Sequence, residues 1–476
     1  MKKLFFVSIT AFLVMLTACN KETFEVPDVM APASQTVEMG TTVDVSFSYT
    51  AEAGFKSSSV TFENGTGSVT TDGAADATSG TIVVSFTAGS NAGAGSVKLT
   101  VTDNEDQSTS ATAVIGVVEQ EIEVMVTGNI TENTTWETGM VYVLASRVSV
   151  VDGVTLTIEP GVIVKGEAGT GANATALIIA RGATIMAEGT ADSPIIFTSV
   201  VDEIMPGEVA SPNLEPELNG LWGGLIVLGN APISADASSV QIEGIPPSDQ
   251  NGLYGGNDAG DSSGVIKYIS IRHGGANIGE GNEINGLTLG GVGNTTVIEN
   301  VEIVANQDDG IEFFGGTVNV KNAVVWNTGD DAIDTDQSWA GTIDNFVVIS
   351  PGDECFELDG PEGAMEAGHV IKNGTVKAGS AQGLADLDDN SIVEMTMIYF
   401  FDISEGQDFD EMPDMGGLSV SSLEATIPDG FDVTDFFKEG TDAYVTLVTV
   451  GGNSVGADLS KFQNWAWSAV AGALDF

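Results

Sequence analysis

A motif of about 22 residues occurs three times in succession between Ile298 and Gly363. Each copy carries an asparagine, then an acidic pair eight residues later, then a short stretch of alternating apolar residues. The asparagines are Asn300, Asn322 and Asn345, so the spacing between copies is nearly constant. A period of this length, with glycine-rich corners and no helical pattern, is typical of a parallel β-helix in which each copy forms one coil. The repeat therefore predicts an all-β solenoid.

Stacked coils place equivalent residues about 4.7 to 4.9 Å apart, so each repeated position becomes a column. The asparagine column, continued by Asn373, is expected at corners where a left-handed backbone and an amide bond to the next coil are both needed. A second column is apolar and is expected to alternate inward and fill the core. Its members are Ile311, Phe313, Ile333, Phe356 and Leu358.

A third column is acidic. Glu312, Asp334 and Glu357 alternate with the inward residues and are therefore expected to point outward. Like charges about 5 Å apart repel by roughly 1 kcal/mol in water and about 3 kcal/mol at an effective dielectric near 20. Hard cations relieve such repulsion, so we predict a Ca²⁺ site on this face. An alternative is that the acids are solvated, spread by coil twist or bonded by corner N–H groups. The predicted ligands are Asp308, Asp309, Glu312, Asp330, Asp331, Asp334, Asp353 and Glu357.

The charge balance restricts the possible partners. Acidic residues outnumber basic ones 68 to 15, which gives a formal net charge of −53. Such a surface argues against nucleic acid and against simple electrostatic attachment to anionic lipid. A polyanionic ligand would need a bridging cation.

The N-terminus has the pattern of an export signal. Lys2 and Lys3 precede an apolar stretch that is too short to span a bilayer, and Leu16-Thr17-Ala18-Cys19 follows. This tetrapeptide resembles a bacterial lipobox, which implies cleavage before Cys19 and attachment of lipid chains there. The alternative is an ordinary secretory signal with a chance cysteine. We therefore expect a signal peptide over residues 1–18 and a tether over 19–31.

Two domains are expected after the tether. Residues 32–118 contain short β-rich runs between Gly, Asn, Asp and Ser turns, which is typical of an antiparallel sandwich. These residues resemble the immunoglobulin-like spacers of bacterial surface proteins, but they lack the Cys and Trp pattern of antibody domains. Residues 119–476 are expected to form the β-helix. A Pro- and Ser-rich insertion over 199–263 should lie on one face. Phe462, Trp465 and Trp467 are expected to cap the last coil, and Cys355 should be a buried, inert thiol.

Several longer phrases point to a family. TLTIEPGVIVKG, AEGTADSPIIFTS, WGGLIVLGNAPI and DDGIEFFGGTVNVKNAVVWNTGDDAIDTDQSW resemble a family of uncharacterised Bacteroidota lipoproteins with a right-handed parallel β-helix. The resemblance covers roughly Val124 to the C-terminus and implies the fold, the lipid and an outer-membrane location, but no established activity. More distantly, the fold resembles pectate-lyase-like proteins, which include enzymes and inert binders.

Catalysis by the acidic face is the alternative to binding. The phrase NTGDDAI resembles part of the acidic motif of polygalacturonases, which would make Asp330 and Asp331 candidate acids, with Arg272 and His273 as possible helpers. The departures are large, because those enzymes carry Gly-His-Gly and Arg-Ile-Lys phrases after the acids. Here the Arg-His pair precedes them and no such Arg/Lys phrase follows.

Aromatic rings offer a second way to bind sugars. Trp222, Tyr254, Trp326 and Trp339 occupy insertion or corner positions, where exposed rings would form a glycan-binding groove. We therefore expect a lipid-anchored, surface-facing outer-membrane protein that binds a carbohydrate or another surface component with the help of Ca²⁺. A polysaccharide lyase or glycoside hydrolase is the first alternative, and an accessory subunit of an outer-membrane uptake receptor is the second.

Overall fold

The computed structural model describes residues 23–276, 284–410 and 417–476. The chain divides into two compact units, Met1–Glu121 and Ile122–Phe476. Cys19, the predicted lipid site, lies outside the described residues. Among the described residues, no helix combines the length and apolar character needed to cross a membrane.

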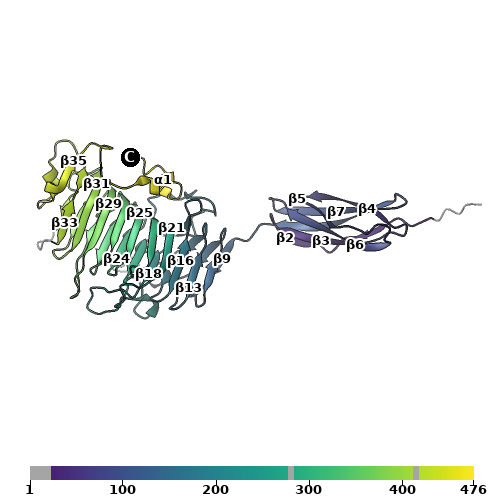
Figure 1. Ribbon diagram of the computed structural model, residues 1–476, viewed down its shortest axis with the longest axis horizontal. Helices are drawn as coiled ribbons and strands as arrows, with labels where there is room; N and C mark the ends of the chain where they lie inside the picture. The colour runs from purple at the N-terminus through teal and green to yellow at the C-terminus, as the bar shows by residue number, and fades with distance from the viewer. Residues whose placement is uncertain (1–22, 277–283, 411–416) are drawn as a thin grey trace, which may run out of the picture. The chain divides into compact units, whose positions relative to one another are not determined.

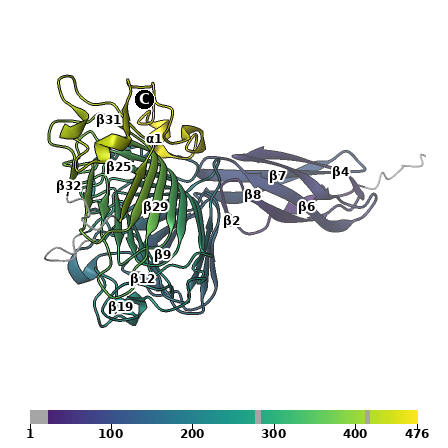
Figure 2. The same ribbon diagram turned by 60° about the vertical axis from the view of Figure 1, so that its left-hand side comes forward.

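The first unit is a β-sandwich of two four-stranded sheets (Figures 1 and 2). Alternate residues of its strands, such as Phe47, Phe86 and Leu99, are fully buried and form one core. β1 (Asp28–Met30) pairs with β3 (Thr42–Thr50), so the sheet begins at Asp28, inside the stretch expected to be a tether. One sheet has the order β1 (Asp28–Met30), β3 (Thr42–Thr50), β6 (Ser79–Ala88) and β5 (Gly65–Thr71), and the other β2 (Gln35–Glu38), β8 (Ser108–Val118), β7 (Gly93–Asp103) and β4 (Phe55–Glu63).

The second unit is a parallel β-helix whose coils build two long sheets, one of 16 strands and one of nine (Figure 1). The predicted all-β fold of a sandwich followed by a β-helix is therefore confirmed. The nine-stranded sheet, which carries the acidic column, runs in the order β12 (Val148–Val150), β15 (Leu177–Ile179), β18 (Leu225–Leu228), β22 (Leu287–Gly290), β24 (Ile311–Phe314), β26 (Ile333–Asp336), β28 (Glu357–Leu358), β30 (Ala385–Leu387) and β32 (Phe409–Asp410).

The 16-stranded sheet forms the rest of each coil. Its main path is β9 (Glu123–Val126), β11 (Val141–Leu144), β14 (Ile163–Gly166), β17 (Ile195–Ser199), β21 (Gly264–Arg272), β23 (Val297–Val304), β25 (Asn319–Trp326), β27 (Thr342–Ile349), β29 (His369–Lys377), β31 (Val393–Phe401), β34 (Leu423–Ala425) and β35 (Val445–Leu447). Off this path lie β10 (Thr134–Trp136), β13 (Thr155–Ile158), β16 (Thr184–Glu188) and β33 (Leu418–Ser421).

The asparagine column bends these strands. β21 pairs with both β16 and β17, so two strands of the early coils become one long strand in the later coils. The bend lies at a left-handed residue, with φ of 59° at Asn300, 58° at Asn322 and 63° at Asn345. The side-chain Nδ2 of Asn322 donates to Oδ1 of Asn300 at 2.9 Å, and that of Asn345 donates to Asn322 at 2.8 Å. Asn373 also has a left-handed backbone, with φ of 57°, but its side chain donates to Asp344 and not to Asn345. The predicted asparagine column is therefore confirmed, except for this last amide bond.

The inward column is also confirmed. All five predicted core residues, from Ile311 to Leu358, are fully buried in one cluster that runs through the coils. Cys355 is buried in the same cluster as a free thiol. Each coil therefore contributes side chains to a continuous apolar core, which stabilises the stack.

Part of the insertion covers the outer face of the nine-stranded sheet. Ile233, Ile242 and Tyr254 pack with outward residues such as Ile226 and Phe314 in a separate apolar cluster. The short antiparallel pair β19 (Val240–Gln241) and β20 (Leu253–Tyr254) stiffens this part of the insertion. The expected loop over one face is therefore a packed layer.

The C-terminal aromatic residues lie elsewhere than expected. Phe462, Trp465 and Trp467 pack on outward residues of the middle coils, including Val304 and Trp326, and α1 (Trp467–Val470) lies over that sheet (Figure 1). The prediction that they cap the last coil is wrong. The middle coils carry apolar residues on their outer face, and packing the three aromatic side chains there removes that apolar surface from water. The end of the core is closed instead by a different aromatic pair, Phe436 and Phe437, and Phe437 contacts Phe400 and Phe409.

Candidate cation site

The acidic column lies on the outer side of the nine-stranded sheet. Glu312 pairs in register with Asp334, and Asp334 pairs with Glu357. The register continues to Asp386 of β30 and then to Asp410. The sequence repeat did not predict Asp386 and Asp410, because the repeat fades after residue 373. The alternation of Ala-Asp-Leu at 385–387 is the signal that could have identified Asp386 as a member of the column.

Burial of this column differs from the expectation. Glu312 and Asp334 point away from the core, yet their side chains are only 5% and 8% exposed, while Glu357 is half-buried. The insertion explains the difference, because it packs over this face beside Phe314 and brings Glu243 close to the column. The outward acids are therefore enclosed between the sheet and the insertion.

A second acidic column lies at the corner before these strands. Asp309 and Asp331 are 7% and 5% exposed. The backbone N–H of Asp331 donates to Oδ1 of Asp309 at 3.0 Å, and that of Glu354 donates to Oδ1 of Asp331 at 2.5 Å. Each carboxylate thus accepts a bond from the next coil, as expected for acids that corner N–H groups stabilise.

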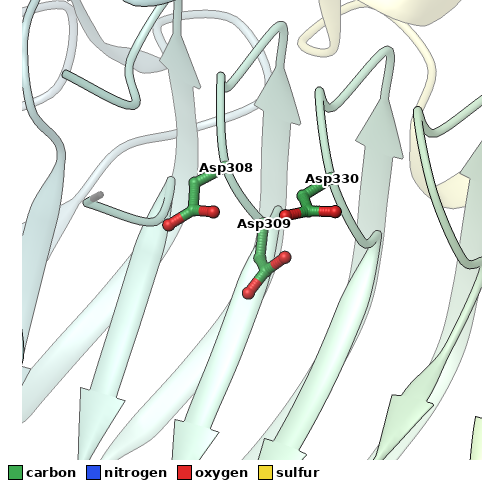
Figure 3. A group of neighbouring side chains, drawn as sticks. All are labelled: Asp308, Asp309 and Asp330. Atoms are coloured by element: carbon green, nitrogen blue, oxygen red, sulfur yellow. The ribbon is translucent and has the colours of Figure 1, made fainter. Parts of the chain in front are cut away.

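Two carboxylate triads share Asp309. Asp309, Glu312 and Asp334 form a buried triad, and Asp308, Asp309 and Asp330 form one at the half-buried rim. In each triad, one oxygen per residue lies within 4.8 Å of the others. Figure 3 shows Asp309 between Asp308 of its own corner and Asp330 of the next coil. Of the other predicted ligands, Asp331 lies beside Glu357, which adds to the effect of burial in raising its pKa, and Asp353 is half-buried outside both triads.

Burial and mutual repulsion change the acidity of the site. Burial raises the pKa of Asp309, Glu312 and Asp334 well above the usual range, and neighbouring carboxylates raise the pKa of each further. The same causes raise the pKa of Asp331 to about 10, of Asp336 to about 8 and of Asp359 to about 7. Ionisation of the buried triad is therefore disfavoured unless a cation compensates its charge.

The buried triad leaves one oxygen unsatisfied. Oδ1 of Asp334 is buried and has no hydrogen-bond partner. An ionised carboxylate in this position is costly unless a positive charge compensates it. None of the ion pairs formed by described lysine and arginine residues includes Asp309, Glu312 or Asp334. A set of carboxylate oxygens without a basic partner fits a hard divalent cation.

The candidate catalytic helpers Arg272 and His273 are buried on the outer side of the 16-stranded sheet. Arg272 Nε donates to Ser270 Oγ at 2.8 Å, and its guanidinium lies 4.9 Å from the centre of the Trp467 ring. His273 is held by the carbonyl of Leu218 through Nδ1. Burial lowers the pKa of both residues. Both residues contact Trp467, and the groups that Arg272 and His273 bond with their side chains, on Ser270, Glu302 and Leu218, do not include the candidate acids.

The four candidate sugar-binding rings are buried. Trp222, Tyr254, Trp326 and Trp339 are between 0% and 8% exposed, so the expectation of an exposed aromatic groove is wrong. Trp339 stacks on Phe313 with ring centres 3.9 Å apart, and Trp326 lies against Trp467. Trp222 and Trp339 belong to the coil core, Tyr254 packs in the insertion layer and Trp326 lies under the C-terminal aromatic residues, because large rings are stabilised by burial.

Comparisons with known proteins agree with the coil architecture. A family model described as a pectate-lyase like beta helix domain matches residues 128–397, more than half of the chain. Comparison with curated proteins gives no match. Among solved structures, a family 28 exopolygalacturonase from Yersinia enterocolitica aligns over 89% of this chain and 90% of its own, with 10% identity and a TM-score of 0.25. Values this low carry no inference about function.

Proposed function

The chain belongs to the family of pectate-lyase-like β-helix domains, and from this premise we propose that it is a calcium-dependent carbohydrate-binding protein. In this proposal, lipid on Cys19 anchors the protein in the outer membrane. The family supports a carbohydrate ligand, because the domain is described by its likeness to a protein that acts on pectate, a polysaccharide. The charge of −53 supports a cation between the protein and any anionic sugar.

The observation that carries the proposal is the buried triad of Asp309, Glu312 and Asp334 with its unsatisfied oxygen. Ca²⁺ binds 6–8 oxygen ligands at about 2.3–2.6 Å and tolerates irregular geometry. These three residues would hold the ion, and its charge would offset the repulsion that burial makes worse. Ca²⁺ suits this site better than Zn²⁺ or Cu²⁺, because the triad offers only oxygens and those metals favour nitrogen and sulfur ligands.

Burial favours binding over catalysis. Side chains that are 5–8% exposed can reach an enclosed ion but cannot contact a sugar ring. Asp308 and Asp330, the half-buried members of the rim triad, are where a carbohydrate can approach the coils. The buried ion would hold this rim in place through Asp309, which both triads share.

Binding of a polysaccharide panel by the full chain tests this function. The full chain, purified in detergent, is expected to bind at least one polysaccharide in CaCl₂ and to lose most of that binding in EDTA or on Asp334→Asn. Glu394→Gln, which changes an exposed acid of the other sheet, should bind as the wild type does. Retention of binding in EDTA would contradict the proposed calcium dependence. Absence of binding to every polysaccharide in a broad panel would contradict the proposed carbohydrate ligand.

The same samples decide the enzymatic alternative. Asp331 lies beside Glu357, whose carboxylate adds to the effect of burial in raising the pKa of Asp331, and pairs of carboxyl groups about 5–9.5 Å apart carry out glycoside hydrolysis. New reducing ends or unsaturated sugars that disappear on Asp331→Asn would replace the binding proposal by a hydrolase or lyase.

The lipid anchor is tested by fractionation. The wild-type chain is expected to take up labelled palmitate and to sediment with outer membranes, and Cys19→Ala should lose the label and shift to the soluble fraction. An unlabelled wild-type chain would contradict the anchor.

Co-purification of the labelled chain with an outer-membrane receptor would support the accessory role instead of independent glycan binding.

A further inference from the structure

We propose that Asn285 completes the buried cation site as a neutral fourth ligand, through its side-chain oxygen. This inference rests on the proposed cation at Asp309, Glu312 and Asp334. Asn285 was absent from the predicted ligands, because it lies outside the three copies of the repeat and carries no charge.

The register places Asn285 one coil before Asp309, at the equivalent corner position. Leu287 pairs with Ile311, and the N–H of Gly286 donates to the carbonyl of Asp309 at 3.0 Å. The corner column therefore begins at Asn285 and continues through Asp309 and Asp331. The step from Asp309 to Asp331 is bridged by a backbone N–H that donates to the side-chain oxygen. In contrast, Oδ1 of Asn285 has no hydrogen-bond partner, although the residue is only 1% exposed.

The amide of Asn285 lies between two carboxylates. Its Nδ2 donates to Oε2 of Glu312, a member of the triad, and lies 3.4 Å from Oε1 of Glu243 in the insertion. Turning the amide over would exchange its oxygen and nitrogen and place Oδ1 against Glu312, where two acceptors face each other whenever Glu312 is ionised. The first orientation leaves Oδ1 of Asn285 without a hydrogen-bond partner, and the second places Oδ1 against a carboxylate oxygen of Glu312. A cation beside Glu312 resolves the conflict, because it binds both oxygens at once.

A neutral oxygen suits this position. The triad already supplies three negative charges to one divalent ion, and a further carboxylate would add repulsion. Amide carbonyls are ordinary Ca²⁺ ligands, and Ca²⁺ accepts more oxygens than Mg²⁺ does from an all-protein cage. Asn285 also connects the site to Glu243, so the ion would join the insertion to the coils.

Calcium titration of three full-length proteins tests this role. Isothermal calorimetry with CaCl₂ at pH 7.5 compares the wild type with Asn285→Leu, which keeps the size but removes the oxygen, and Asn285→Asp, which keeps an oxygen. Asn285→Leu is expected to weaken binding by at least roughly tenfold, as loss of a metal-site partner does. Asn285→Asp should bind within about threefold of the wild type and gain more thermal stability from calcium. Asn294→Asp, an exposed change nearby, is the charge control and should behave as the wild type does.

Each outcome separates the two proposals. If Asn285 serves only as a hydrogen-bond donor to Glu312, Asn285→Asp loses calcium binding as fully as Asn285→Leu, and the ligand role is overturned. If both variants bind as the wild type does, the ligand role also fails while the cation site stands. A wild type that binds no calcium overturns the site itself. If Asn285→Leu does not fold, Asn285→Asp decides by its thermal stability: a larger calcium-induced rise in melting temperature than that of the wild type supports the ligand role, and an equal or smaller rise overturns it.

Discussion

Removal of divalent cations is expected to lower the melting temperature of the full chain by about 5 °C at pH 8 and by much less at pH 5. A ligand present at 100 times its Kd stabilises the folded state by about 2.7 kcal/mol, and 1 kcal/mol corresponds to about 2–4 °C for a domain of 150–250 residues. The buried triad supplies the site. Scanning calorimetry with EDTA and with CaCl₂ at both pH values measures the effect.

The dependence on pH follows from the raised pKa values. In the unfolded chain these carboxyl groups ionise near pH 4. In the folded, cation-free chain the pKa is about 7 for Asp359, about 8 for Asp336 and about 10 for Asp331. Between pH 4 and these values the folded state holds more protons than the unfolded state. Its stability therefore falls as the pH rises through this window.

Calcium binds the ionised forms of Asp309, Glu312 and Asp334, whose pKa values are also raised, so its stabilisation is expected to grow with pH. Asp334→Asn removes a charge and a ligand together, so this variant should be less sensitive both to EDTA and to pH. Glu394→Gln, on an exposed part of β31, should keep both sensitivities. Equal melting temperatures with and without chelator at pH 8 would contradict a bound cation, and a wild type that is more stable at pH 8 than at pH 5 in EDTA would contradict the raised pKa values.

Replacement of Glu302 is expected to release the C-terminal segment, residues 457–476. Glu302 is fully buried and accepts bonds from the N–H of Trp467 at 3.0 Å and from the N–H and Oγ of Ser468 at 2.8 and 2.7 Å. It also lies 3.9 Å from Arg272, which is itself fully buried. Glu302→Ala leaves the guanidinium without its counter-ion, which typically costs about 3–5 kcal/mol.

Limited proteolysis with mass spectrometry measures this release. Glu302→Ala should be cut within the C-terminal segment at protease concentrations that leave the wild type intact, while the coils remain folded. The matched control is Glu299→Gln on the same strand, whose ion pair with Lys267 is partly exposed and worth about 0–1 kcal/mol. The double variant Arg272→Met with Glu302→Leu should recover part of the protection, because no buried charge remains. Unchanged proteolysis of Glu302→Ala would show that aromatic packing alone holds the segment.

The asparagine column shows what a single sequence predicts well. Asn300, Asn322 and Asn345 recur with the coil period, and each has the left-handed backbone and the amide bond that the repeat implies. The requirement is local, because each residue interacts mainly with its equivalent one period away. The inward column follows for the same reason, since alternation along a strand decides which side chains enter the core.

The aromatic residues show where such reasoning fails. Trp326 is at the end of a strand and outward by alternation, yet Trp467, from the far C-terminal end of the chain, covers it. Period and alternation say which way a side chain points, but they do not say which distant segment packs over it. The position of the C-terminal segment and the burial of the predicted rings were unpredictable for this reason.

The sequence by itself determined the stack of coils, the outward direction of Glu312 and Asp334, and the spacing of one carboxylate per coil, because all three follow from the nearly constant period of the repeat. Only the tertiary structure decided that these carboxylates are enclosed. An insertion of unrelated sequence packs over the sheet beside Phe314, and Glu312 and Asp334 are almost fully buried. Enclosure turns a mild repulsion between solvated acids into strongly raised pKa values and an unsatisfied oxygen. That change in environment makes the column a candidate cation site.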